Sequence, residues 1–345
     1  MKRLVLFILS SSLAFAQPKA LFYMTTNPDS VKSFSEHADQ IDILVPAWYS
    51  VDANGLVWGG PNPAVLETAA AHHVPVMPIV ALMNQADLHK LFITPAARGA
   101  FIAALLSECK NNGYSGFQID FEDVNWTDRD LLSSLVADTA AALHSQKLQL
   151  TIATVPNAPG HPGAGDYSHW LYANWRGGYD LQALAQSADL ICLMTYDQNT
   201  RWTSPGPVAG YPWTVTNVDY ALRFVPKEKL SVGIPLYGYH WYAGNPIKVD
   251  PTKEERPNPT ASYVGQRDID QYIAAYHPHV EWDPTDRTAW FYFYRDDTRE
   301  WVFYTDKRTF EERLNLMRDR GLEGFCSWVL GTEDPQIWSL LPRHK

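Results

Sequence analysis

The sequence predicts an α/β fold: a closed (β/α)8 barrel with a small α+β insertion between the seventh strand and its helix. Eight short apolar runs alternate with eight helical segments, and continuous apolar runs are typical of parallel strands that are buried on both faces. Polar and aromatic residues gather at the carboxyl ends of these runs, where such barrels place their reactive groups. The alternative is a doubly wound open sheet, but no glycine-rich phosphate turn follows an early strand.

The strands and helices are expected to alternate along the whole chain. The strands are expected at residues 20–25, 41–49, 75–81, 114–124, 148–155, 189–197, 230–237 and 324–330. The helices are expected at residues 29–40, 61–73, 86–112, 128–146, 181–187, 218–225, 307–320 and 333–341, from apolar residues at helical spacing, prolines at helix starts and the stop Asn111-Asn112-Gly113. Two loops rich in glycine, proline and aromatic residues, 156–178 and 198–213, are long enough to carry function.

The insertion is expected at residues 241–306, where the alternation breaks. Two aromatic runs with period two, 289–294 and 300–304, flank the polar residues 295–299, which indicates a hairpin. The barrel is then expected to consist of residues 17–240 and 307–345.

The first 16 residues resemble a secretory signal peptide. Lys2 and Arg3 precede an apolar run at residues 4–9, and small residues at Ala14 and Ala16 predict cleavage after Ala16. The apolar run is too short for a stable membrane span, although an uncleaved anchor is the alternative. We therefore expect a secreted or periplasmic monomer without a membrane anchor.

Charge and composition limit the classes of partner that this protein is expected to bind. The chain has 28 Lys and Arg against 38 Asp and Glu, and loss of Lys2 and Arg3 with the leader changes the formal charge from −10 to −12. This balance argues against nucleic acid or an anionic membrane as a partner. The 13 Trp and 18 Tyr suit the apolar faces of sugar rings, although ordinary core packing explains part of them.

The three cysteines are expected to be buried thiols. Cys192 and Cys326 lie in apolar runs, and an odd count with Cys109 forbids complete internal pairing. A Cys192–Cys326 bridge is the alternative. No metal-ligand spacing appears in the sequence, so no metal and no cofactor are expected.

The fourth predicted strand, residues 114–124, carries the candidate catalytic groups. Gln118, Asp120 and Glu122 share one face, and large apolar side chains occupy the other. Buried carboxyl groups are costly unless they are paired or used, although an edge strand facing water is the alternative. Asp120 and Glu122 lie about 6–7 Å apart along the strand, a separation that glycosidic cleavage uses. Glu122 is the candidate general acid, kept partly protonated by apolar surroundings and by Asp120.

Residues 115–122, SGFQIDFE, resemble the motif DGxDxDxE of glycoside hydrolase family 18, the chitinase-like (β/α)8 hydrolases. MTYD at 194–197 and GIPLYGY at 233–239 resemble the sixth and seventh strand segments of this family, and Trp328 stands where the family places the tryptophan under the cleaved sugar. The expected insertion also resembles the α+β subdomain that the family inserts after its seventh strand. The segments 205–209 and 333–338 resemble a bacterial branch that includes the spore-cortex peptidoglycan N-acetylglucosaminidases.

The resemblance implies retaining hydrolysis in which the substrate's own 2-acetamido oxygen attacks the anomeric carbon. Glu122 would protonate the leaving oxygen, and Asp120 would orient the acetamido group and stabilise the positive intermediate. Tyr196 would hydrogen-bond the acetamido group. The alternative for Tyr196, Trp328 and Tyr237 is ordinary packing. The alternative for Asp197 is a helix cap or a salt bridge. The expected substrate-binding residues are Gln118, Trp328, Asp197, Tyr237 and Trp48.

Two positions depart from the family motif. Ser115 replaces the first Asp and Gln118 the second. An acid at position 118 could share a proton with Asp120, whereas an amide cannot. We therefore expect Asp120 to ionise more readily, with an altered pH dependence of activity.

Three functions compete. The first is an exported hydrolase of β-1,4 linkages next to N-acetylglucosamine, in chitin or chitooligosaccharides, peptidoglycan or N-glycan cores, with endo and exo action both open. The second is a non-catalytic, lectin-like protein on the same barrel, which the presence of Glu122 disfavours. The third is a two-carboxylate glycosidase, for which Asp197 is the only candidate nucleophile.

Overall fold

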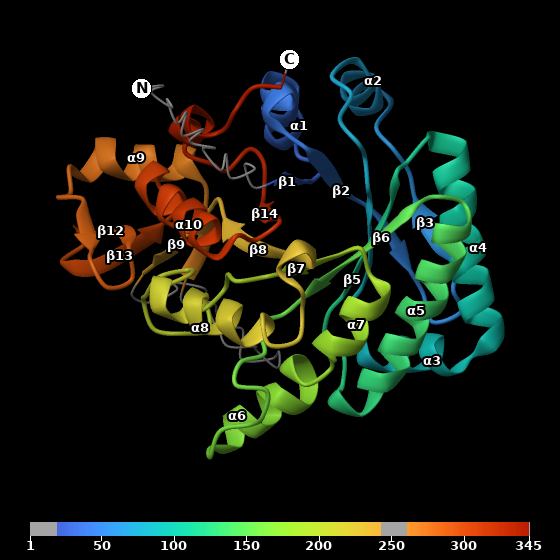
Figure 1. Ribbon diagram of the computed structural model, residues 1–345. Coiled ribbons are helices and arrows are strands. Elements are labelled where there is room, and N and C mark those ends of the chain that lie inside the picture. Colours follow the sequence, from blue (N-terminus) through green and yellow to red (C-terminus); the bar gives the residue numbers. More distant parts are fainter. Residues whose placement is uncertain (1–18, 243–260, 345) are drawn as a thin grey trace, which may run out of the picture.

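The barrel that the sequence predicts is present in the structure, a computed structural model that describes residues 19–242 and 261–344. The expected signal peptide lies outside the described residues. The barrel strands are β1 (Lys19–Met24), β2 (Ile43–Val51), β4 (Ile79–Leu82), β5 (Gly116–Phe121), β6 (Gln149–Thr154), β7 (Leu190–Leu193), β8 (Leu230–Pro235) and β14 (Gly324–Trp328). All eight run parallel to their neighbours, and β1 pairs with both β2 and β14, which closes the barrel (Figure 1).

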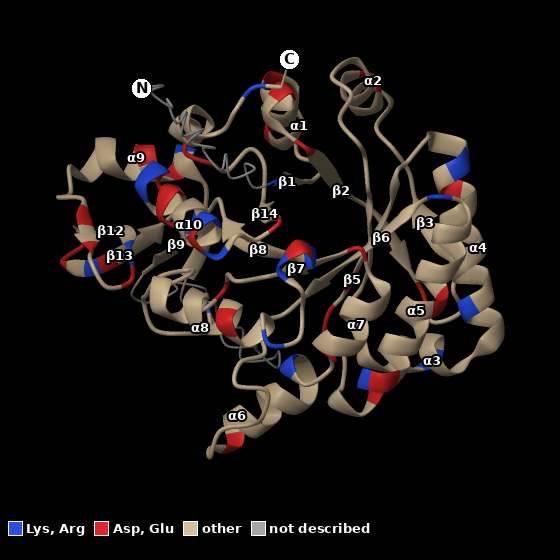
Figure 2. Cartoon of the chain, viewed as in Figure 1, with Lys and Arg blue, Asp and Glu red and all other residues tan. Residues whose placement is uncertain are grey.

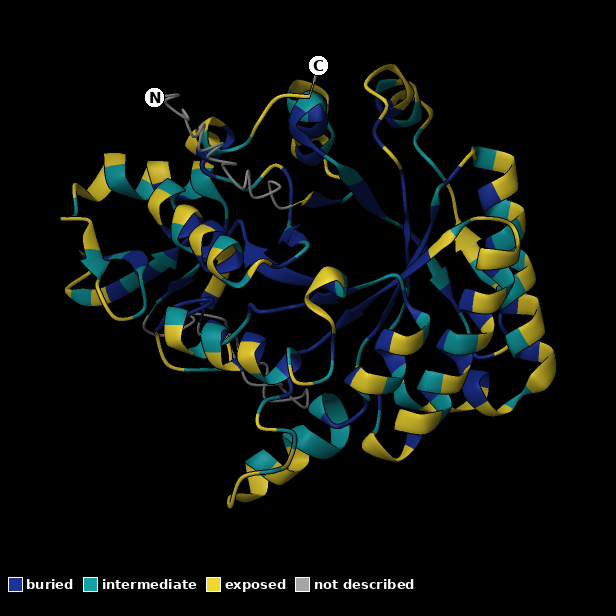
Figure 3. Cartoon of the chain, viewed as in Figure 1, coloured by how far each residue is buried: buried dark blue, intermediate teal, exposed yellow. Residues whose placement is uncertain are grey.

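The helices surround the barrel, and their bounds follow local sequence signals. They are α1 (Pro28–His37), α2 (Pro63–Ala71), α3 (Gln85–Ile93), α4 (Pro95–Asn112), α5 (Arg129–Ser145), α6 (Asp166–Leu171), α7 (Leu181–Ser187), α8 (Tyr211–Ala221) and α10 (Lys307–Arg320). Charged residues lie mostly on these helices and on the loops (Figure 2), while the barrel strands are almost entirely buried (Figure 3).

Several expected elements differ from the structure, and the clearest differences have local causes. The helix expected at 86–112 is two helices, because Thr94 takes an extended conformation before Pro95. The helix expected at 218–225 already begins at Tyr211, after Gly210 and with a proline in its first turn. The expected last helix is a 3-10 turn, Pro335–Leu340. The third strand pairs continuously only after Pro78, since proline has no N–H to donate.

Among residues 19–242 and 261–344, no single helix has the length and the hydropathy that crossing a bilayer requires. Helices α3 and α4 meet both requirements only when they are taken together, and this pair is bent by 95°.

The expected insertion forms its own antiparallel sheet beside the barrel, and this sheet begins at Gly238, before the expected bound at residue 241. It contains β9 (Gly238–Trp241), β10 (Ala261–Val264), β11 (Glu281–Asp283), β12 (Thr288–Arg295) and β13 (Thr298–Tyr304), in the order β10-β9-β13-β12-β11. Helix α9 (Gln266–Tyr276) packs on this sheet through Ile269, Tyr272 and Ile273. The expected hairpin is confirmed, with a tight turn at Asp296-Asp297, where both residues have positive φ.

Two apolar layers position the strand that carries the acids. The layer between strands and helices includes Phe117, Ile119 and Phe121 of β5. A smaller cluster fills the barrel and includes Cys192 and Cys326. The alternation along β5 is therefore as expected. All three cysteines are buried free thiols, so the bridge considered as the alternative is absent.

Candidate active site

A cavity of about 290 Å³ lies at the carboxyl ends of the barrel strands. Six of the residues predicted for the site line it, namely Asp120, Glu122, Tyr196, Asp197, Tyr237 and Trp328. Residues that the sequence analysis did not select complete the wall, namely Tyr23, Met83, Ala153, Met194, Tyr239 and Tyr263. The predicted residues come from four different strands or strand ends, so closure of the barrel brings them together.

Burial raises the pKa values of the two acids at the end of β5. Asp120 points into the barrel with 8% of its surface exposed, and this burial raises its pKa to about 6. Glu122 follows the last residue of β5, and burial together with the charges of Asp120, Asp123 and Asp197 raises its pKa to about 8. The charge of Asp120 therefore favours a proton on Glu122, which suits Glu122 as the acid and Asp120 as the charge stabiliser.

Tyr196 and Asp197 leave the end of β7 in a tight turn instead of continuing the strand. The N–H groups of Thr195 and Tyr196 donate to the carbonyls of Leu193 and Met194, and Asp197 has a φ of 58°. Burial raises the pKa of Tyr196 well above its ordinary value, so its hydroxyl stays a hydrogen-bond donor. A Cβ at Gly233 would lie 2.9 Å from the Tyr196 ring, which is closer than a side-chain carbon allows, so the glycine leaves space for this ring.

Asp197 is held by tyrosine hydroxyls. The hydroxyl of Tyr237 donates to its Oδ1 at 2.6 Å, and that of Tyr239 lies 3.5 Å away. Burial raises the pKa of Asp197, whereas these two hydrogen bonds lower it. Within the described ranges Asp197 takes part in no ion pair and caps no helix. Neither the salt bridge nor the helix cap considered as alternatives for this residue is therefore present there.

Aromatic rings form the walls of the cavity. Trp328 ends β14 and lies 5.5 Å from the ring of Tyr23 on β1. Tyr263, on β10 of the insertion, stacks on Tyr237 at 4.4 Å. Tyr239 is the last residue of the segment GIPLYGY at 233–239, so its place in the sequence was a usable signal for the site. The sequence contains no such signal for Tyr263, because only the tertiary fold brings the insertion over the barrel.

The expectation that Gln118 contacts substrate is corrected. Its side chain is completely buried and does not line the cavity. Its Nε2 donates to Thr151 Oγ1 at 3.1 Å and contacts Cys192 Sγ at 3.2 Å. The alternation along β5 places Gln118 inside the barrel as predicted, but two residues deeper than Asp120, where the opposite strands cover it.

The expectation that Trp48 binds substrate is also corrected. A bulge between Ala47 and Tyr49 interrupts the register of β2 with β4. Trp48 lies in the layer between strands and helices, on the same face as Leu44, and packs near Tyr114. Alternation from Leu44 therefore already points Trp48 away from the cavity. The bulge, which period two does not reveal, adds Tyr49 to the same layer, although Val45 and Ala47 face the barrel interior.

Glu122 has one further neighbour that the sequence analysis did not identify. The side chain of Trp175, from the loop after β6, hydrogen-bonds the Glu122 carboxyl and lowers its pKa, against the effect of burial. For metal binding, residues 19–242 and 261–344 contain no group of three or more His, Cys, Asp or Glu side chains that could hold an ion.

A (β/α)8 barrel whose strand ends carry a protonated Glu, a buried Asp and a wall of aromatic rings is the arrangement of a glycosidase. The profile of glycosyl hydrolases family 18 matches residues 21–333, so the chain belongs to this family.

Relatives include spore enzymes and chitinases. The "uncharacterized glycosylase YvbX" of Bacillus subtilis is 22% identical over 98% of this chain and 94% of its own length. The cortical fragment-lytic enzyme of Bacillus anthracis is 26% identical over 78% of this chain and 59% of its own. A chitinase structure from Chromobacterium violaceum matches with a TM-score of 0.80 at 25% identity, covering 93% of this chain and 97% of that one.

Proposed function

We propose that this protein is an exported glycosidase that cleaves β-1,4 linkages next to N-acetylglucosamine by substrate-assisted, retaining hydrolysis. The observation that carries the proposal is the placement of Glu122, whose pKa is raised, and the buried Asp120 in one aromatic cavity. Membership of family 18 supports the hydrolase class.

The proposed first step transfers the proton of Glu122 to the glycosidic oxygen. The bond from this oxygen to the anomeric carbon breaks, and its electron pair stays with the leaving oxygen. The acetamido oxygen of the substrate forms the new bond to the anomeric carbon. The ionised Asp120 then faces the positive ring intermediate, with one oxygen, Oδ1, that has no partner among the described residues.

In the proposed second step the ionised Glu122 takes a proton from a water molecule, whose oxygen forms a bond to the anomeric carbon. The bond between the acetamido oxygen and this carbon breaks at the same time, and its electron pair returns to the acetamido group. The Tyr196 hydroxyl supports this course as a donor to the acetamido group, and Trp328 offers a flat apolar face to the sugar ring. Both side chains line the same cavity as the two acids.

The substrate proposed is a polymer that contains N-acetylglucosamine, with peptidoglycan and chitin as the two candidates. The names of the relatives support each, since they include cortical fragment-lytic enzymes and endochitinases. The binding-only alternative has less support, because the acid expected to be missing from a lectin is present as Glu122.

The test is hydrolysis of purified peptidoglycan and of chitin oligosaccharides by the wild type and by Glu122→Gln, with mass detection of the new ends. We expect products that end in reducing N-acetylglucosamine from one polymer, and at least a thousandfold loss in the variant. Binding without cleavage by the wild type would reject the enzyme in favour of the lectin-like alternative.

The stereochemical course needs a separate measurement. Proton NMR of the first product should show retention of the anomeric configuration, and a thiazoline analogue of the cyclic intermediate should inhibit. Inversion would exclude acetamido participation and would direct attention to Asp197 as a base.

A further inference from the structure

A short hairpin follows the carboxyl end of β2, at the end of the barrel that holds the active-site cavity. Its second strand is β3 (Val57–Gly59), which pairs antiparallel with the last residues of β2. Val57 and its partner Val51 pack on the outer apolar layer. Because side chains alternate along a strand, Trp58 points from the opposite face, the one that continues the barrel interior.

A row of paired residues leads from Trp58 to Asp120. Trp58 pairs with Ser50 of β2, and Ser50 pairs with Ala81 of β4. Ala81 pairs in turn with Asp120 of β5. Paired residues on neighbouring strands share one face of the sheet. Ala81 packs on the cluster that fills the barrel, and Asp120 lines the active-site cavity, so the face of this row is the inner one.

The bulge in β2 is the reason that Trp58 faces inward. Strict alternation from Ala47, which faces the barrel interior, would place Ser50 on the outer face. The bulge between Ala47 and Tyr49 adds one residue and returns Ser50 to the inner face. Its partner Trp58 then takes the same face. An aromatic ring thus stands at this rim, although Trp48 of the same strand points away.

The length of the row gives the distance from the reacting sugar. Neighbouring strands lie ~4.8 Å apart, so three spacings separate Trp58 from Asp120 by roughly 14 Å. A β-1,4-linked sugar residue is about as long as one strand spacing. A sugar that contacts Trp58 would therefore be about three residues along the polymer from the sugar over Asp120.

The ring of Trp58 is free to contact a ligand. Its exposed fraction is 53%, and among residues 19–242 and 261–344 no aromatic ring or cation packs on it. Trp170, by comparison, stacks on Tyr167 at 6.1 Å. Leu56 on the same hairpin and Met83, which lines the active-site cavity, are also exposed. Large apolar side chains that are exposed together beside a cavity are typical of a binding surface.

The hairpin is held in place, so Trp58 is positioned before a ligand binds. Asp52 Oδ1 accepts from the N–H groups of Asn54 and Leu56 at 2.8 and 2.9 Å. Lys90 of α3 donates from Nζ to Asn54 Oδ1 at 2.9 Å. A ring on a fixed support loses little conformational freedom on binding, which favours affinity.

A further cavity extends the active site toward this hairpin. It has a volume of about 240 Å³, shares Tyr263 and Trp328 with the active-site cavity, and includes Thr25 and Asn27, which follow β1. β1 pairs with β2 on the side of β2 away from β4, and β3 pairs with the end of β2 on that same side. The cavity therefore leads from Trp328 toward the strands next to Trp58.

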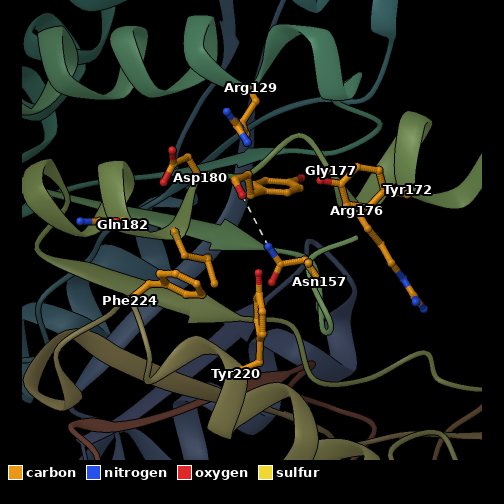
Figure 4. Close-up of a pocket in the computed structure, with 12 residues that line it drawn as sticks. Arg129, Asn157, Tyr172, Arg176, Gly177, Asp180, Gln182, Tyr220 and Phe224 are labelled. Atoms are coloured by element: carbon orange, nitrogen blue, oxygen red, sulfur yellow. Dashed lines mark hydrogen bonds between the residues drawn. The ribbon is translucent and has the colours of Figure 1, made fainter. Parts of the chain in front are cut away.

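Figure 4 shows a different cavity, of about 230 Å³, between the loop after β6 and α8. Arg129, Arg176 and Asp180 bring charges to its wall. Within the part of the chain that the structure describes, none of its lining residues also lines the active-site cavity. It does not lengthen the cleft, and its charged wall suits a neutral glycan less than the rim at Trp58 does.

We propose that Trp58 is a distal sugar-binding residue: its indole ring stacks on a sugar about three residues from the one over Asp120, and this contact makes long chains better substrates than short ones. The inference rests on the proposed function, because it takes the ligand to be a β-1,4-linked polymer that contains N-acetylglucosamine. The flat apolar face of a sugar ring matches the face of an indole, and neither carries a charge.

The test compares Trp58→Ala with the wild type on the hexamer and the trimer of N-acetylglucosamine. A trimer bound across the cleavage site is too short to reach Trp58. We expect about a tenfold higher KM for the hexamer with kcat nearly unchanged, and no change for the trimer. Trp58→Phe keeps a ring and should lose less. The control is Trp170→Ala, because Trp170 is 58% exposed on α6, which projects from the barrel (Figure 1).

Calorimetric binding of the hexamer to Glu122→Gln, with and without Trp58→Ala, gives a second readout that does not need activity. We expect about a tenfold weaker Kd from the loss of the ring. Equal losses for trimer and hexamer, or none for the hexamer, would overturn the proposal. So would an unchanged KM together with a change in oligomeric state, which would make β3 an interface between copies. A wild type that neither binds nor cleaves the hexamer would instead reject the proposed function.

Discussion

At the scale of single residues, Glu122 is the side chain with the largest functional consequence. Its acidity is set by burial first and by three neighbouring carboxyl groups second, with Trp175 acting in the opposite direction. The sequence already indicated a partly protonated acid beside Asp120. It could not indicate Trp175, which is remote along the chain and reaches Glu122 only through the fold of a loop.

Glu122→Gln should change how stability depends on pH. The pKa of Glu122 is near 4.5 when unfolded and about 8 when folded, so between these values the unfolded state binds fewer protons and stability falls as pH rises. The penalty is absent below pH 4.5 and complete above pH 8. Glu122→Gln should remove it, with a gain on the order of 3–5 kcal/mol at pH 9 and little change at pH 4. Urea denaturation at both pH values measures this, and equal gains at the two would contradict a raised pKa.

Gln118→Asp tests the departure from the family motif. An aspartate there would be completely buried two residues below Asp120 and would lose the donor contacts to Thr151 and Cys192. Its negative charge would disfavour ionisation of Asp120, whose pKa burial already raises to about 6. We expect the acidic limb of the pH–rate profile to move upward by about one pH unit. Gln118→Glu is the control of similar length, and an unchanged profile in both would reject a link between residues 118 and 120.

At the scale of elements, local signals explain most helix and strand bounds, and the exceptions have local causes. Pro95 divides one expected helix, and Pro78 shortens the third strand. The bulge in β2 turns Tyr49 to the outer face, where Trp48 already lies by alternation with Leu44. The alternation along β5 was predictable because one face of the run is uniformly large and apolar, and it places both acids correctly.

Arg313 connects three elements, and we expect its loss to be costly. It lies on α10 with 1% of its surface exposed and donates from Nη2 to the Ala209 carbonyl before α8 and, at 3.2 Å, to that of Asp286 in the insertion. Burial lowers its pKa to about 10, so it remains charged at neutral pH.

Arg313→Ala should reduce the free energy of unfolding by roughly 3 kcal/mol, since two carbonyls lose a charged donor and a buried volume empties. Thermal or urea denaturation measures the change. Glu311→Ala, at an exposed position of the same helix, should cost less than about 0.5 kcal/mol. Equal effects of the two substitutions would contradict the bridging role of Arg313.

At the scale of the whole molecule, stability comes from barrel closure and apolar burial rather than from covalent bonds. All three cysteines are buried free thiols, and burial raises the pKa of Cys109 to about 12. We expect three thiols to react with a thiol reagent in denaturant and almost none in the native state. A melting temperature that falls on addition of a reductant would contradict this arrangement.

Export remains a proposal that one mass measurement checks. Secreted protein should begin at Gln17, with Lys2 and Arg3 removed, as measured by intact mass after expression with the natural leader. Ala14→Leu together with Ala16→Leu should block cleavage, because the processing site needs small residues. Mature protein that still carries residues 1–16 would support the uncleaved anchor instead.

The sequence by itself determined the alternation of strands and helices, the two acids on the inner face of β5 and the aromatic residues at the strand ends. Such features depend on local periodicity, which is visible along the chain. Only the tertiary structure decided that Gln118 lies too deep, that a bulge turns Tyr49 outward, and that Tyr263 and Trp175 come near the site. Depth, bulges and loop closure depend on contacts between segments far apart in sequence, and period two carries no information about them.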